Sequence, residues 1–173
     1  MRPASLLALC LLALPATSAQ AQIIDPQSMM NTGVEIAATA LANALVASRD
    51  AAWTQGTQPM PPNIRDALLR WYPADLLDSV EYRVGVAEDA SIQSLSMRYS
   101  DATAVTAIDM IIFHDAWDAQ NNVALWGHEM KHVEQFRDWG LMDFARRYVR
   151  DHQAVEAEAY AIEAEIKART GGG

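Results

Sequence analysis

Two histidines and one glutamate at a fixed spacing are the residues of this chain best suited to chemistry. His128, Glu129 and His132 form the pattern H-E-x-x-H. Residues four apart lie on one face of a helix, so both imidazoles can reach a single metal ion. A glutamate beside the first histidine can accept a proton from a water molecule at that metal. The pattern predicts a Zn²⁺ site held by His128 and His132, with Glu129 as the catalytic base.

The helical wheel of the segment around the motif places all three residues on its apolar side. At about 100° per residue, Leu125, Glu129, His132 and Phe136 fall within about 60° of one another, with His128 beside them. The charged residues of the opposite side are Lys131, Glu134 and Asp138. A carboxylate within a buried stripe is unfavourable unless it is paired or functional. The alternative is a metal-free helical scaffold with two core histidines and an ion-paired Glu129.

A catalytic zinc site needs a third protein ligand. His114 follows a predicted strand and His152 ends a short polar linker, and the spacing of neither requires it to reach the motif. The last predicted helix carries Glu156 and Glu158 on opposite sides of its apolar face. Periodicity does not choose between these two glutamates, so both stay candidates for the third ligand.

Peptide hydrolysis also requires a hydrogen-bond donor that stabilises the developing oxyanion. Four residues of the C-terminal half carry a suitable donor, and none is singled out by its spacing: Tyr148, Tyr160, His114 and His152. Trp126 and Trp139 flank the motif and are interpreted first as packing residues.

The N-terminus is typical of a secretory signal peptide. Arg2 supplies a positive charge, residues 5–15 form an apolar run too short to span a bilayer, and residues 19–21 fit a small-x-small cleavage pattern. We expect cleavage after Ala21 and a periplasmic or secreted location. Cys10 lies inside this segment, so the mature chain would hold no cysteine, and its metal ligands must be His, Asp or Glu.

The charge of the chain argues against nucleic acid as a partner. The 173 residues include 13 basic and 22 acidic side chains, and loss of Arg2 would leave 12 and 22, a net charge of −10. Such a chain is repelled by phosphate backbones and anionic lipids. We also expect no membrane span after removal of the signal peptide, because no second apolar run is long enough.

The order of predicted elements indicates an α+β fold, mostly α, with a small antiparallel sheet. Apolar periodicity separates the helical segments from the β-branched strands. The expected helices are 29–48, 63–71, 74–77, 123–138, 141–149 and 153–169; the expected strands are 80–84, 94–99 and 106–113; 49–62 is expected as a linker and 115–122 as a polar loop. We further hypothesise that helix 29–48 covers the site as a pro-segment.

The motif and the following helix resemble the gluzincin metallopeptidases. The pattern Glu156-x-x-Ala159 comes 24 positions after His132. In that family the glutamate of this pattern is the third zinc ligand, so the resemblance implies Glu156. One departure is Tyr160, which stands where relatives often carry an aspartate that orients a ligand histidine.

A closer resemblance is to the small HExxH domains of the extracellular contractile injection system core family. Three segments carry it: the Pro-x-x-I/V-R-x-x-L opening at 61–68, the Thr-containing apolar strand at 106–113, and the run Leu-x-x-His-Glu-x-x-His-Val-x-Gln at 125–135. Met130 and Lys131 replace a commoner Leu-Thr pair, but the two histidines and the glutamate are kept. The resemblance implies a minimal zincin-like domain.

The expected organisation is a signal peptide at 1–21, a helix and linker at 22–58, and a zincin-like metallopeptidase domain at 59–170. The predicted activity is hydrolysis of peptide or protein substrates by zinc-activated water. The alternative is a secreted domain that binds zinc without turnover and serves in interactions.

Overall fold

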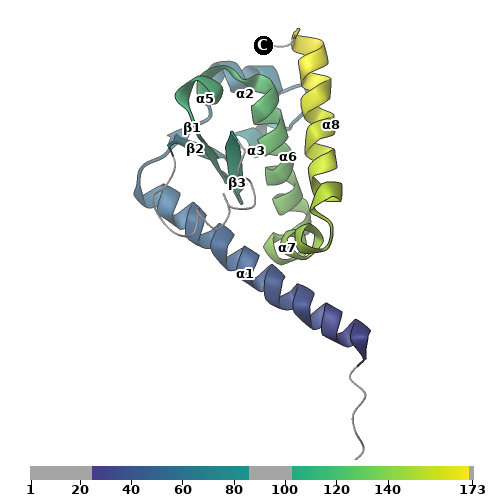
Figure 1. Cartoon of the computed structure of the whole chain (residues 1–173). Helices are drawn as coiled ribbons and strands as arrows, with labels where there is room; N and C mark the ends of the chain where they lie inside the picture. Colours follow the sequence, from purple (N-terminus) through teal and green to yellow (C-terminus); the bar gives the residue numbers. More distant parts are fainter. Residues whose placement is uncertain (1–24, 86–102, 172–173) are drawn as a thin grey trace, which may run out of the picture.

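The computed structural model describes residues 25–85 and 103–171, and it confirms a mostly helical α+β fold (Figure 1). Within these residues the helices are α1 (Pro26–Thr54), α2 (Pro62–Leu68), α3 (Ala74–Leu77), α5 (Ala116–Asn121), α6 (Val123–Trp139), α7 (Leu141–Arg150) and α8 (His152–Thr170); the strands are β1 (Gln58–Pro59), β2 (Glu81–Val84), β3 (Ala104–Ala107) and β4 (Met110–Phe113). None of the described helices combines the length and apolar character needed to cross a bilayer. The expected signal peptide and the strand predicted at 94–99 lie outside the described residues.

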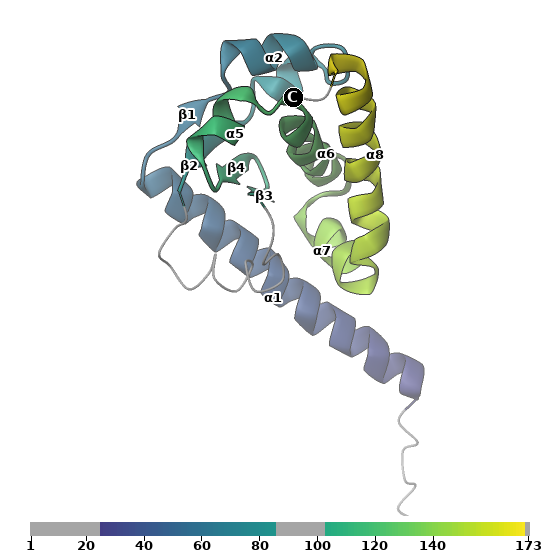
Figure 2. The ribbon, with the colours of Figure 1, turned by 45° about the horizontal axis from the view of Figure 1, so that its top comes forward.

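Helix α6 runs between the sheet and α8, as both views show (Figures 1 and 2). The Asn122 side chain caps its first turn by accepting the amide of Leu125 at 3.1 Å, and Gly140, with φ of 75°, ends it. Trp126 is fully buried against Phe113, with ring centroids 4.7 Å apart. The sheet therefore holds the motif-bearing helix through an aromatic core, and the packing role expected for Trp126 is confirmed.

Gly127 brings α6 and α8 close together. A Cβ atom built at Gly127 would lie 2.1 Å from the Cδ1 atom of Ile166 on α8, well inside van der Waals contact. Its carbonyl oxygen accepts the Tyr72 hydroxyl at 2.7 Å. The missing side chain lets α8 approach directly beside His128, so the glutamates of α8 can reach the motif. Packing of the HExxH helix against a Glu-bearing helix is thereby confirmed.

The sheet is mixed, so the prediction of an antiparallel sheet was wrong in this respect. Its strand order is β1-β2-β4-β3, with β2 and β4 parallel and the other two pairs antiparallel. The segment 106–113, expected as one strand, turns back at Ile108 and Asp109 to form a hairpin, and Ile108 has φ of 66°. Arg49 on α1 binds the Asp109 carboxylate. This contact comes from outside the hairpin, so the local pattern could not reveal the turn.

Two segments expected to lack regular structure are helical. Residues 49–54, assigned to a linker, continue α1, because Ala52 is buried against Met110 and Ile112 of β4. The polar segment 115–122 contains α5, whose first turn is capped by the Asp115 carboxylate accepting the amides of Trp117 and Asp118. Both helices depend on capping or tertiary burial rather than on apolar periodicity.

Candidate metal centre

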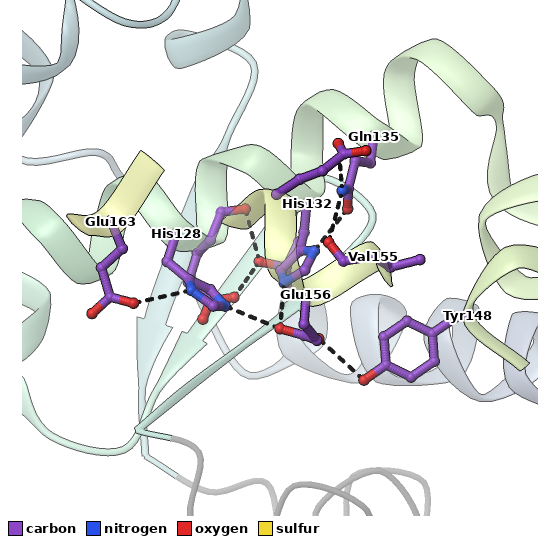
Figure 3. Close-up of polar contacts among 10 residues, drawn as sticks. His128, His132, Gln135, Tyr148, Val155, Glu156 and Glu163 are labelled. Carbon is purple, nitrogen blue, oxygen red and sulfur yellow. Dashed lines mark hydrogen bonds and ion pairs between the residues drawn. The ribbon is translucent and has the colours of Figure 1, made fainter. Parts of the chain in front are cut away.

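The structure brings His128, His132 and Glu156 together (Figure 3). The Nε2 atoms of His128 and His132 lie 3.3 and 3.4 Å from the same Glu156 oxygen, Oε2. Ligand atoms about 2.1 Å from a tetrahedral zinc ion are separated by about 3.4 Å. Both imidazoles are buried, and one ligand atom from each residue lies within 4.8 Å of the others. These three side chains can hold a metal ion.

The outer nitrogen of each imidazole has its own oxygen partner. His128 Nδ1 lies 3.2 Å from Glu163 Oε2, and His132 Nδ1 lies 2.9 Å from Gln135 Oε1. Gln135 Nε2 donates to the Val155 carbonyl at 3.1 Å, which directs the amide oxygen of Gln135 toward His132. Both partners can accept hydrogen bonds, which favours the neutral tautomer with the hydrogen on each Nδ1 and the lone pair on each Nε2.

Three acceptor atoms therefore converge at one point. The two Nε2 lone pairs face a carboxylate oxygen, an arrangement that is repulsive unless a proton or a metal ion lies between them. Burial tends to lower the pKa of His132, but the hydrogen bond that the protonated ring donates to Glu156 and the charges of Glu129 and Glu156 raise it above its usual value. Burial tends to raise the pKa of Glu156, but both histidines hold it far below its usual range. These three side chains together therefore favour a bound proton or metal cation between them.

Glu129 lies beside this cluster and is only 4% exposed. The Thr106 hydroxyl, on β3, donates to Glu129 Oε2 at 2.6 Å and also lies 3.2 Å from the Glu129 carbonyl oxygen. This contact fixes one carboxylate oxygen of Glu129, and both residues line the same pocket. A general base needs such a fixed orientation.

A pocket of about 190 Å³ opens onto these groups. The hydroxyl of Tyr148, on α7, donates to Glu156 Oε1 at 3.1 Å. The ring of Tyr160 lies edge-on to His128, with centroids 4.8 Å apart, and the residue is 60% exposed. Burial, and then the charges of Glu156, Glu163 and Glu129, raise the pKa of Tyr160, so its phenol stays protonated and can donate.

The remaining candidates for the third ligand or the oxyanion donor, His114, His152 and Glu158, do not line the pocket. His114 and His152 are exposed and are not among the described residues that line it. Glu158 accepts Gln135 Nε2 at 3.1 Å and lies 3.5 Å from Lys131 Nζ, so it contacts the outer side of the cluster. Of the two glutamates that periodicity left open, Glu156 is the one placed with the histidines.

Sequence reasoning missed three residues that orient the site: Thr106, Gln135 and Glu163. Glu163 supplies to His128 the carboxylate contact that Tyr160 cannot supply, from one turn further along α8. Its spacing of seven residues from Glu156 puts both on one helix face, which was the available signal. Gln135 lies three residues from His132 on the same helix, which was a similar signal. The contact of Thr106 depends on the packing of β3 against α6, for which the sequence offers no comparable signal.

Comparison with known proteins supports the resemblance to one family. The family model of the eCIS core domain matches residues 59–140. This region includes His128, Glu129 and His132, whereas α1 and the glutamates of α8 lie outside it. Neither the curated proteins nor the solved structures contain a match to this chain.

Proposed function

We propose that this chain is a zinc-dependent peptide hydrolase in which His128, His132 and Glu156 hold the metal and Glu129 is the general base. The observation that carries the proposal is the convergence of two imidazole Nε2 atoms on one carboxylate oxygen of Glu156, beside the buried Glu129.

The donor set fits zinc. Two imidazole nitrogens and one carboxylate oxygen are the ligands of many catalytic zinc sites, and residues 25–85 and 103–171 contain no other such cluster. When bound there, zinc supplies Lewis acidity toward a water molecule and a carbonyl oxygen. Glu163 and Gln135 keep the imidazole rings oriented, and the hydrogen bond from Tyr148 holds the Glu156 carboxylate.

Glu129 is placed to move a proton. It accepts the proton of a water molecule whose oxygen forms a bond to the peptide carbonyl carbon. The carbon–nitrogen bond then breaks as the proton passes from Glu129 to the leaving nitrogen. One water molecule is consumed, and one carboxylic acid and one amine are released. Thr106 holds Glu129 in place throughout, through its hydroxyl at 2.6 Å.

Tyr148 and Tyr160 are the two pocket tyrosines that can donate to an oxyanion. Tyr148 donates its hydroxyl hydrogen to Glu156, so it would have to exchange that bond to reach an oxyanion, while the exposed Tyr160 lies at the side of His128. Their position supports hydrolysis over zinc binding alone, because a site without any donor would lack oxyanion stabilisation. The substrates proposed are peptides or proteins outside the cytoplasm, in agreement with the signal-like N-terminus.

The test combines metal content with hydrolysis. Elemental analysis of the purified chain is expected to find about one zinc ion per chain, and none in His132→Ala. Against a library of fluorogenic peptides, Glu129→Gln is expected to keep its zinc and its fold but to lose at least about 100-fold in kcat/KM.

Two results would count against the proposal in different ways. If neither protein binds zinc after incubation with the metal, the motif is structural and the enzyme hypothesis fails. If zinc binds but the wild-type chain and Glu129→Gln hydrolyse no peptide, the chain is a zinc-binding module without turnover.

A further inference from the structure

Helix α1 supplies part of the pocket that holds the proposed metal ligands. Leu41 and Leu45 line the same cavity as His128 and Glu129. Leu45 is buried among Phe136, Phe144 and other apolar side chains of α6 and α7. Figure 2 shows α1 running past the sheet and α7, and it contacts both. The region that matches the family model begins at residue 59, so α1 lies outside it.

The apolar wall that Leu41 and Leu45 form is held in place by contacts along much of the length of α1. Near its end, Arg49 Nη2 donates to Asp109 Oδ2 at 2.7 Å. In its middle, Glu35 binds Arg146 Nε of α7 at 2.9 Å. Ala52 is fully buried against the sheet. Helix α1 is thus held against the sheet and α7 on both sides of Leu41 and Leu45. This attachment favours a permanent part of the pocket and argues against the hypothesis that α1 is a removable pro-segment.

The size and charge of the pocket limit what it can accept. A cavity of about 150 Å³ can enclose a benzene-sized molecule, and the present pocket measures about 190 Å³. Its apolar wall is formed by Leu41, Leu45 and Phe144, while three glutamates approach the other side. Lysine and arginine are missing from the described residues that line it, so an acidic side chain would be repelled.

We infer that the site accepts peptides with one aliphatic residue of about leucine size beside the bond to be cut, and that Leu41 and Leu45 of α1 set this size limit. The inference rests on the proposed function. Burial of each methylene against this wall strengthens binding about fourfold.

Binding of alkyl hydroxamates tests the inference without measuring turnover. These probes bind zinc through their two oxygens and carry an alkyl chain of chosen length. Calorimetry would compare acetohydroxamate with hexanohydroxamate on the zinc-loaded full chain, after its zinc content has been measured. We expect hexanohydroxamate to bind at least about tenfold more tightly.

Substitutions at Leu41 should change this ratio in both directions. Leu41→Phe is expected to reduce the preference for hexanohydroxamate at least about fivefold and to leave the affinity for acetohydroxamate unchanged. Leu41→Ala is expected to shift the optimum to octanohydroxamate. The matched control is Val46→Ala, on the same helix but exposed and outside the pocket lining, which should leave the ratio unchanged.

The possible failures are distinguishable. If the wild-type chain binds zinc and both hydroxamates equally, or if Leu41 variants behave like Val46→Ala, the inference is overturned and the proposed zinc site stands. If the chain binds neither zinc nor acetohydroxamate, the proposed function fails and the inference fails with it.

Discussion

Two helix pairs of this molecule, α6 with α8 and α1 with α7, show different ways of fixing a contact. Between α6 and α8, Gly127 permits close approach, and buried hydrogen bonds orient the side chains that meet there. Between α1 and α7, the buried contacts are apolar and include Ala38, Ala42 and Ala145, together with Leu45 against Phe144. The ion pair between these two helices, Glu35 with Arg146, lies away from the residues that line the pocket. The pair α6 and α8 can therefore hold a precise ligand geometry, whereas α1, packed on α7, supplies an apolar side of the pocket.

The largest expected effect distinguishes the two glutamates of α8. Glu156→Gln should weaken zinc binding more than about 100-fold, beyond the usual effect of losing an outer contact, because its charged oxygen lies at both histidines. Glu158→Gln should weaken zinc binding less than about tenfold, since Glu158 contacts Gln135 and Lys131 on the outer side of the cluster. Competition with a fluorescent zinc chelator measures both. Equal effects would contradict the assigned ligand set.

A second prediction concerns the carboxylate behind His128. Glu163→Ala should weaken zinc binding about 10–100-fold, because His128 Nδ1 loses the acceptor that orients its ring. Glu165→Ala is the matched control on the same helix, since Glu165 binds Trp71 and Arg169 outside the pocket. Partial recovery of zinc affinity in Glu163→Gln, whose amide oxygen can still accept, would support an orienting role. A loss of folding stability with unchanged zinc affinity would refute it.

The close approach of α6 and α8 should be sensitive to a single methyl group. Gly127→Ala places a Cβ atom against the buried Ile166. Overpacking costs about 1–3 kcal/mol, and the better helix propensity of alanine returns about 1 kcal/mol. We expect a net loss of up to about 2 kcal/mol in the free energy of unfolding, measured by urea denaturation, together with weaker zinc binding. Unchanged stability and zinc affinity would show that the Ile166 side chain on α8 can move to accept the extra methyl group.

The smallest expected effect is at the corresponding substitution on α1. Gly33 lies in the exposed part of the helix, and a Cβ atom there would meet nothing within 4 Å. Gly33→Ala should raise the free energy of unfolding by about 0.5–1 kcal/mol, because alanine loses less backbone freedom. The same urea titration measures it, and zinc affinity should not change. A destabilised Gly33→Ala chain would indicate a contact on this face of α1.

Much of the helical architecture could be predicted from local pattern. The ends of α6 and α7 differ from prediction by one residue, since apolar periodicity and Gly140 mark them. The hairpin at Ile108 and the helix end at Thr54 could not be predicted, because they depend on Arg49 binding Asp109 and on Ala52 packing against β4. Similarly, the sequence could not choose between Glu156 and Glu158, which lie two residues apart on one helix.

The sequence alone determined the chemistry available to this protein. Residues four apart on a helix share a face, and a chain without cysteine beyond Cys10 must use imidazole and carboxylate ligands. Only the tertiary structure decided how that chemistry is oriented and enclosed. Glu156, Glu163 and Leu41 come from helices distant in sequence, and their positions relative to His128 depend on long-range packing that local periodicity does not encode.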